Sequence, residues 1–414
     1  MSESASKPSK HVLLIVFLTV FIDLIGFGII IPIQPFFAEA LGASPATVTL
    51  LGASYSLMQF LFAPFWGALS DRFGRRPIIL VSLGTGFIGY LLFGFSHSLV
   101  ALFGSRMLAG FGAANIGTAQ AMIADSTTKA DRAKGMGLIG AAFGLGFIFG
   151  PALGGIFGQF GMAMPAFVAA GLCAANWLFA FFRLPETLPV EARAKAGSAR
   201  VGLRFSTLRR CARHTDVTRL FGLYLGYTLA FAMMEQVMGL FIEHYWVHSV
   251  PGAVGHAKHA AALTTFVLVV VGITATFVQG GLIGRLAKRM GERKLLVLGT
   301  ACVATSFLAI PFIGTTGFFA LLLVDCVLMA FGQGLTTPSL SSLLSQAVDE
   351  EERGGALGVG QSLSALGRVV GPSAAGLLFQ SGAGLPFFVG GGLLFLCTGL
   401  SATLRNRGEG AGHH

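Results

Sequence analysis

The sequence predicts an all-α integral membrane protein, with twelve transmembrane helices in two pseudo-symmetric six-helix bundles. Three observations support this fold class. First, 54% of the 414 residues are hydrophobic and only 11% are charged, whereas soluble domains are about 25% charged. Second, apolar stretches of roughly 20 residues, the length that crosses a bilayer, recur along the chain. Third, the two halves of the chain repeat each other in their polar loops.

Twelve candidate spans follow one another, each bounded by polar or charged residues. They cover residues 12–38, 46–67, 77–96, 98–124, 134–159, 164–183, 217–244, 260–284, 294–313, 317–345, 355–380 and 384–404. Several contain glycines and an internal proline, which are tolerated where membrane helices pack closely. The N-terminal segment MSESASKPSK shows no cleavage signal, so we expect the first apolar stretch to be retained as a span.

The positive charges predict the orientation, because cytoplasmic loops carry an excess of Lys and Arg. With the N-terminus inside, the basic residues outside the spans fall in inner loops, except Lys258. We therefore expect a multi-pass protein of the inner (plasma) membrane with both termini in the cytoplasm. The net charge of +10 does not indicate nucleic-acid binding, because the basic residues lie at the ends of apolar stretches and not on one solvated face.

The longest connection, residues 184–215, divides six spans from six. It is polar, basic and poor in aromatic residues, which favours a cytoplasmic linker over a nucleic-acid patch. The predicted organisation is an N-terminal bundle over residues 1–183, the linker, and a C-terminal bundle over residues 216–414.

Two pairs of segments carry the internal repeat. The segment GALSDRFGRRPII at 67–79 aligns with GRLAKRMGERKLL at 284–296, and residues 132–157 align with residues 353–378. Many secondary transporters are built from such repeats and bind substrate near the midplane between them. The repeat therefore predicts a transporter. The aligned residues are Gly67 with Gly284, Arg72 with Arg289, Gly74 with Gly291, Arg76 with Arg293, Gly150 with Gly371, and Pro151 with Pro372.

The loop GALSDRFGRR at 67–76 places four charges within six residues between two apolar stretches. Gly67 and Gly74 allow close backbone approach and positive φ, and a carboxylate suits a helix N-terminus. The orientation rule alone explains the arginines but neither the acid nor the spaced glycines. We therefore predict a conformational switch here. Its charged residues are Asp71, Arg72, Arg75 and Arg76.

This loop resembles the signature loop of the major facilitator superfamily. Three further stretches resemble its twelve-span drug/proton antiporter branch, and their sequences are most similar to those of tetracycline/proton exporters. These stretches are DLIGFGIIIPIQPFF (23–37), RMLAGFGAANIGTAQAMIAD (106–125) and GLGFIFGPALGGIFG (144–158). The resemblance covers essentially the whole chain. It implies the major facilitator fold and proton-coupled export (antiport) of amphipathic small molecules or drugs by alternating access.

The resemblance also implies roles for particular residues. It pairs Arg75 with Asp125 at the end of the fourth span. The small residues of the fifth span let it press on a neighbour, for which we predict a seal on the outer side between the halves; ordinary glycine packing of a transmembrane helix is the alternative. The residues of this antiporter motif are Gly146, Gly150, Pro151, Gly154 and Gly155. We expect no enzymatic activity, cofactor or metal, and a monomer in the bilayer whose partners are protons and a small-molecule substrate.

Three departures from the tetracycline exporters put tetracycline itself in doubt. The acid that those proteins carry in the third span aligns with Gly89, and the acid in their ninth span aligns with Val303 or a neighbour. Their eighth-span histidine aligns near Ala275. Export of another amphipathic compound stays consistent with the sequence.

Only three carboxylates lie well inside spans: Asp23, Glu235 and Asp325. Ionisable groups at membrane depth are costly and suggest function, and proton coupling needs a carboxyl group whose protonation changes with its surroundings. At 1.5 Å per residue, Asp23 lies roughly 18 Å from the inner boundary and Arg106 roughly 14 Å from the outer one, which are nearly equal heights in a core of roughly 30 Å. We therefore expect these two residues to pair, either for coupling or as a permanent ion pair.

For the second half we expect Asp325 to pair with Arg368 and Glu235 to line a wet cavity; both acids, with Asp23 and Arg106, are candidates for proton coupling. Flexible methionines around Glu235 suit a promiscuous pocket. Polar candidates could bind substrate in an apolar pocket or bridge helices, and both alternatives stay open. The predicted substrate-binding residues are Gln34, Gln59, Asn115, Met234, Glu235, Gln236, Gln361 and Arg368.

Two other functions compete with export. One is a metabolite or sugar transporter of the same fold, possibly without proton coupling. The other is a polytopic membrane enzyme, for which the histidines around the loop 245–259 could form an outer metal site. Only Glu243 supports that site among the acids, so we do not favour it. The chain holds no Walker or kinase-like nucleotide motif, which argues against ATP as the energy source.

Overall fold

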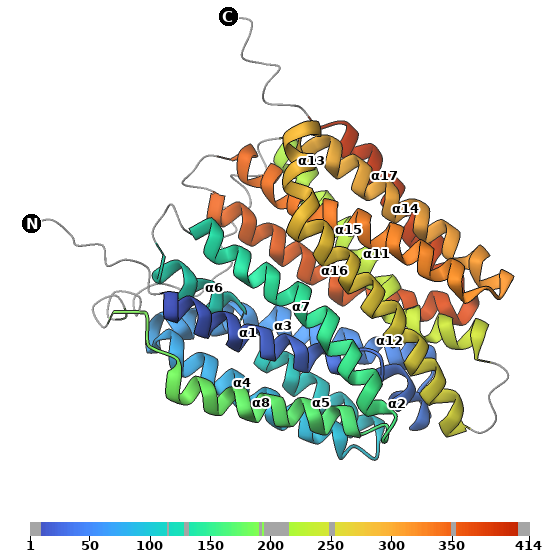
Figure 1. The fold of residues 1–414 in the computed structure, drawn as a ribbon, viewed down its shortest axis with the longest axis horizontal. Helices are drawn as coiled ribbons and strands as arrows, with labels where there is room; N and C mark the ends of the chain where they lie inside the picture. The colour runs from blue at the N-terminus through green and yellow to red at the C-terminus, as the bar shows by residue number, and fades with distance from the viewer. Residues whose placement is uncertain are drawn as a thin grey trace, which may run out of the picture. The chain divides into compact units, whose positions relative to one another are not determined.

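The computed structural model describes residues 10–113, 116–127, 132–189, 193, 215–247, 253–348 and 353–404. These residues fold into helices joined by short connections (Figure 1). The described residues contain eleven candidate spans that are long and apolar enough to cross a membrane, and the apolar segment Gly144–Gly158 coincides with the predicted fifth span. The predicted all-α membrane fold is confirmed.

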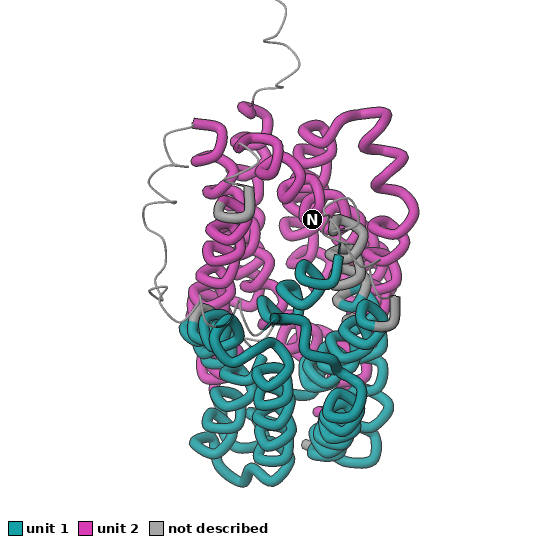
Figure 2. The backbone as a smooth tube through the Cα atoms, turned by 90° about the vertical axis from the view of Figure 1, so that its left-hand side faces the viewer, with its two compact units in different colours: residues 1–43, 54–203 teal, residues 44–53, 204–414 magenta. Residues whose placement is uncertain are grey.

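The chain divides into two compact units (Figure 2). Unit 1 comprises residues 1–43 and 54–203, and unit 2 comprises residues 44–53 and 204–414. The helices up to the central connection are α1 (Lys10–Ile30), α2 (Gln34–Ala40), α3 (Pro45–Phe73), α4 (Arg75–Gly94), α5 (Leu99–Gly112), α6 (Ile116–Asp125), α7 (Arg132–Gly158) and α8 (Met164–Arg183). The first residues of α3 therefore belong to unit 2.

The later helices are α11 (Thr215–Trp246), α12 (Ala253–Phe277), the π-helical η2 (Val278–Leu282), α13 (Ile283–Met290), α14 (Glu292–Thr316), α15 (Phe319–Ala347), α16 (Arg353–Ser381) and α17 (Leu385–Ala402). The predicted first span is not one continuous helix. It consists of α1 and α2, which are separated around Pro32, because proline has no N–H to continue the helical hydrogen bonds.

The internal repeat reappears in the packing of the helices. In unit 1, α1 packs against α7, and α4 packs against α5 and α8. In unit 2, α11 packs against α16, and α14 packs against α15 and α17. Each unit has its own apolar core. One lies around Leu83, Met122 and Ile123 in unit 1, and another around Phe241, Phe307 and Phe387 in unit 2.

Candidate functional site

The loop between α3 and α4 is a single residue. α3 ends at Phe73 and α4 begins at Arg75, so Gly74 alone makes the turn. Its φ of 105° lies in a region that L side chains rarely adopt, and glycine enters that region without steric cost. The turn brings the charged end of α3 back over the first turn of α4.

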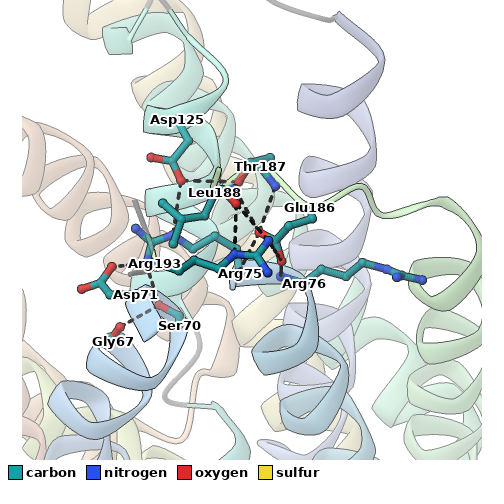
Figure 3. Close-up of polar contacts among 10 residues, drawn as sticks. All are labelled: Gly67, Ser70, Asp71, Arg75, Arg76, Asp125, Glu186, Thr187, Leu188 and Arg193. Atoms are coloured by element: carbon teal, nitrogen blue, oxygen red, sulfur yellow. Dashed lines mark hydrogen bonds and ion pairs between the residues drawn. The ribbon is translucent and has the colours of Figure 1, made fainter. Parts of the chain in front are cut away.

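Arg75 is the centre of this site and is only 8% exposed. Its Nη1 lies 2.5 Å from Asp71 Oδ1, and its Nε lies 3.2 Å from Asp125 Oδ2 (Figure 3). Nη1 also donates to Ser70 Oγ at 2.7 Å, and that hydroxyl donates to the carbonyl oxygen of Gly67 at 2.7 Å. The predicted Arg75–Asp125 ion pair is confirmed. It joins the end of α6 to the α3–α4 junction.

Glu186, which the sequence analysis missed, completes the network. Its carboxylate accepts hydrogen bonds from the backbone N–H groups of Arg75 at 2.9 Å and Arg76 at 3.2 Å (Figure 3). It also lies 3.5 Å from Nη2 of Arg193. The first N–H groups of a helix have no intrahelical acceptor, and a carboxylate there is favoured by the helix dipole. The first turn of α4 contains no acid of its own, and this absence was the sequence signal for an acidic cap from another segment.

The two remaining arginines of the loop make other contacts. Nη2 of Arg76 donates to the carbonyl oxygen of Phe181 at the end of α8 at 2.6 Å, and its guanidinium lies 5.8 Å from the centre of the Phe181 ring. Arg72 stands over the neighbouring ring of Phe73. The loop network therefore ties together the ends of α3, α4, α6 and α8, with Arg72 at its edge.

The corresponding junction of unit 2 has the same backbone turn. Gly291, with a φ of 78°, separates α13 from α14. The first residue of α14 is Glu292, whose carboxylate accepts hydrogen bonds from Ser342 Oγ and Gln346 Nε2, both at 2.5 Å. Nη2 of Arg293 donates to the carbonyl oxygen of Ala402 at the end of α17, also at 2.5 Å.

A polar cluster lies inside unit 1, away from the loop. Arg106 of α5 is only 4% exposed and stands 4.5 Å from the centre of the Tyr55 ring. Its Nε and Nη1 have no hydrogen-bond partner within the described part of the chain. Tyr90 of α4 lies within electrostatic range of both Asp23 and Arg106. A direct Asp23–Arg106 pair stays a prediction, because the contact that the structure records for Arg106 is with Tyr55.

In unit 2 the predicted Asp325–Arg368 pair stays a prediction, and the contacts that the structure records are with other residues. Asp325 of α15 accepts a hydrogen bond from Ser306 Oγ of α14 at 2.5 Å, and Arg368 of α16 lies within electrostatic range of Glu235 of α11. The packing explains both contacts, since α15 packs on α14 and α16 packs on α11.

The predicted substrate-binding residues do not form one group. Gln59 bridges helices, because its Nε2 donates to the carbonyl oxygen of Ala113 at 3.1 Å. Gln34 and Met234 are buried, whereas Gln361 is exposed. The side chain of Gln236 lies beside Gly52 within unit 2. Asn115 lies outside the described residues, so its predicted role is neither supported nor opposed.

The antiporter-motif glycines of α7 lie against α1 in the same unit. A Cβ built on Gly150 would come within 2.6 Å of Gly28 Cα, and one on Gly146 would come within 2.7 Å of Leu24 Cβ. A Cβ on Gly154 would press on the carbonyl oxygen of Ile29. Gly155 is buried in the same stretch. Close packing by this motif is therefore present, and its predicted role as a seal between the halves stays a prediction.

Comparison with known proteins agrees with this geometry. The family model of the Major Facilitator Superfamily matches residues 16–313 and, in a second match, residues 247–412. The chain belongs to this superfamily, whose members are transporters and not enzymes. Multidrug resistance protein 2 of Bacillus subtilis is 31% identical over 89% of each chain. Tetracycline resistance protein, class C, of Escherichia coli is 33% identical over 88% of each chain.

A solved structure of a related transporter has the same fold. The crystal structure of the human organic anion transporter matches with a TM-score of 0.69 at 27% identity, covering 96% of this chain and 100% of that one. The chain is therefore a multi-pass membrane transporter of the major facilitator superfamily.

One departure from the tetracycline exporters has a structural basis. A Cβ on Gly89 would lie 3.0 Å from Ala109 Cβ and 3.1 Å from its backbone nitrogen. The close contact of α4 with α5 is therefore tight at position 89, and a larger side chain there would require Ala109 to shift. Val303, at the second departure, is fully buried in the apolar core of unit 2.

Proposed function

We propose that this transporter exports amphipathic small molecules in exchange for protons, by alternating access in the inner membrane. In the proposed orientation both termini lie in the cytoplasm, and the chain works as a monomer. The observation that carries the proposal is the polar cluster of unit 1. It places an acid, a buried arginine and a tyrosine from three different helices inside an apolar bundle.

Arg106 is the member of this cluster whose burial costs the most free energy. A buried guanidinium with unsatisfied N–H groups costs several kcal/mol, in the order of magnitude for buried ionic groups. A carboxyl group gains or loses its proton as its distance from such a cation changes. A cycle in which Asp23 and Arg106 approach and separate would therefore take up a proton in one state and release it in the other.

The proposed substrate class rests on the names of two relatives and on the glycine at position 89. Two similar proteins bear the names multidrug resistance protein and tetracycline resistance protein. Position 89, where the tetracycline exporters carry an acid, is a glycine here and packs tightly against Ala109. We infer a substrate that is amphipathic but is not recognised through that acid.

A growth-inhibition panel in a host without its own pumps identifies a transported compound. Wild-type protein in proteoliposomes should then accumulate that compound against its gradient when a pH gradient is imposed, and a protonophore should abolish the accumulation. Accumulation that does not change when the pH gradient is imposed would favour a metabolite or sugar transporter without proton coupling.

The coupling residue is tested in the same vesicles. Asp23→Asn mimics the protonated carboxyl group permanently, so it should abolish uphill transport while retaining downhill movement or exchange. Glu235→Gln, an acid-to-amide change in the other unit, is the matched variant. Full uphill transport by Asp23→Asn, with loss only in Glu235→Gln, would move the coupling site to unit 2.

A further inference from the structure

Asp23 of α1 lies between two contacts that α1 makes with other helices of unit 1. One turn before it, the carbonyl oxygen of Thr19 accepts a 2.8 Å hydrogen bond from Nδ2 of Asn176, a fully buried residue of α8. One turn after it, a Cβ built on Gly26 would lie 3.6 Å from the hydroxyl oxygen of Tyr90 of α4. Residues three and four apart share one face of a helix. Asp23 therefore faces α4 and α8 inside the unit.

Tyr90 extends from α4 toward the helices that carry the acid and the arginine, and it is only 4% exposed. On one side the end of its ring packs on Gly26, where a Cβ would already touch the ring at 3.4 Å. On the other side the neighbouring Gly89 packs on Ala109 of α5, which lies one turn beyond Arg106. The tyrosine lies within electrostatic range of Arg106 and of the α1 acid. α4 thus presents this hydroxyl to both charged side chains.

Two further titratable residues lie close to this group. Cys173 of α8 lies within electrostatic range of Asp23 and Tyr90. Tyr55 of α3 meets Arg106 through the face of its ring, 4.5 Å from the ring centre, which attracts the cation but accepts no N–H bond from its hydroxyl side. Nε and Nη1 of the arginine have no hydrogen-bond partner among the residues that the structure describes. An oxygen atom beside this guanidinium would supply the acceptor that these N–H groups need.

We propose that the hydroxyl of Tyr90 bridges Asp23 and Arg106 when the acid is ionised, as a positioning residue for proton exchange. A tyrosine hydroxyl has one donor and acceptor lone pairs, so it can accept an N–H bond from the guanidinium while it donates to the carboxylate. When Asp23 takes up a proton, the charged acceptor is lost and the bridge weakens. The hydroxyl keeps its own proton throughout. This inference rests on the proposed function, because it assigns a role within proton exchange at Asp23.

The test removes only the hydroxyl. Tyr90→Phe keeps the ring, so the packing on Gly26 is retained. In proteoliposomes, accumulation driven by an imposed pH gradient should fall about ten-fold while downhill transport changes less than about two-fold, as expected for the loss of one hydrogen bond to a charged group. The readout is the ratio of these two rates per folded protein, because a merely structural role would lower both rates together.

Tyr227→Phe is the matched control in unit 2. Tyr227 is a buried residue of α11 whose hydroxyl has no hydrogen-bond partner in the described chain, and its loss should leave the ratio within about two-fold. If Tyr90→Phe reduces the amount of folded protein, Gly26→Val tests the same contact from α1. Its added methyl groups should push the Tyr90 hydroxyl away and lower the ratio, because bulk added to a packed contact displaces its neighbours.

The outcomes distinguish this inference from the proposed function. An unchanged ratio in Tyr90→Phe, together with loss of uphill transport in Asp23→Asn, would overturn the bridge and leave proton exchange at Asp23 standing. Full uphill transport by Asp23→Asn would overturn the coupling role of Asp23 and the bridge with it. Proportional losses of uphill and downhill transport in Tyr90→Phe, or an equal loss of the ratio in Tyr227→Phe, would also overturn the bridge.

Discussion

The two helix junctions related by the internal repeat share a backbone but differ in charge. Gly74 and Gly291 both turn with positive φ, and the arginine two residues later bonds the end of the last helix of its unit in both cases. Between them, however, unit 1 has Arg75 and unit 2 has Glu292. The backbone turn is thus a feature of the fold, while the charges are specific to each half.

The partners of these two residues differ in the same way. Arg75 forms an ion pair with Asp125, whereas Glu292 accepts a hydrogen bond from Gln346, which occupies the position aligned with Asp125. Charged partners respond to changes of distance and solvent exposure more strongly than neutral ones. The difference favours the prediction that the conformational switch lies at the junction of unit 1 and not at the junction of unit 2.

The largest expected effect lies in the glycine packing of α7. Gly154→Leu should abolish transport, because a Cβ at Gly154 already presses on the Ile29 carbonyl oxygen and lies 3.0 Å from Pro32 Cγ, and added bulk in a tight interface strains it. The aligned position in unit 2, Ala375, carries a Cβ and is fully buried.

Ala375→Gly is therefore the matched control. It should cost about 1 kcal/mol of stability, as glycine does in a helix interior, and should retain most transport. Transport rate per folded protein and the unfolding temperature check both variants. Normal transport by Gly154→Leu would show that α1 and α7 do not need this close contact.

The next effect concerns Arg75, the centre of the predicted switch. Arg75→Gln should lower the transport rate at least about ten-fold, which corresponds to about 1.4 kcal/mol, because it leaves Asp125 and Asp71 without their shared cation. Glu292→Gln removes a charge from the aligned position and should change the rate less than about two-fold, since neutral hydrogen bonds can replace its contacts. Similar losses of transport rate in both variants would show that the two junctions contribute equally to transport.

A smaller effect is expected where Glu186 caps α4. Glu186→Gln keeps one acceptor but loses the negative charge at the helix N-terminus, which is worth about 0.3–1 kcal/mol. The transport rate should fall two- to five-fold. Arg193→Gln is the control, because it removes the 3.5 Å ion pair with Glu186 but not the hydrogen bonds to α4. An equal loss in both variants would assign the effect to the ion pair instead of the cap.

The smallest effect belongs to Asp71. Its side chain is 53% exposed, and exposed ion pairs four residues apart on a helix contribute only a few tenths of a kcal/mol. Asp71→Asn should therefore leave the amount of folded protein unchanged and lower the transport rate about two-fold. Loss of protein from the membrane, measured by immunoblot, would instead assign Asp71 a role in topology.

Much of the fold could be predicted because each span has the length and composition that a bilayer requires. The break around Pro32 could not, since prolines also occur within continuous membrane helices. The Arg75–Asp125 pair was predictable from the motif, but Glu186 was not expected because it lies in a connection that reads as a polar linker. The hydrogen bond from Ser306 to Asp325 was not predicted, because sequence position gives the height of a side chain but not the neighbour it faces.

A double-mutant cycle on transport rate tests the difference between the two junctions most directly. One cycle combines Arg75→Gln with Asp125→Asn, and the other combines Glu292→Gln with Gln346→Ala. We predict a coupling of about 1.5 kcal/mol or more for the first pair and less than about 0.5 kcal/mol for the second, within the range that contacting residues show. Equal coupling in both cycles would contradict the prediction that the switch is confined to unit 1.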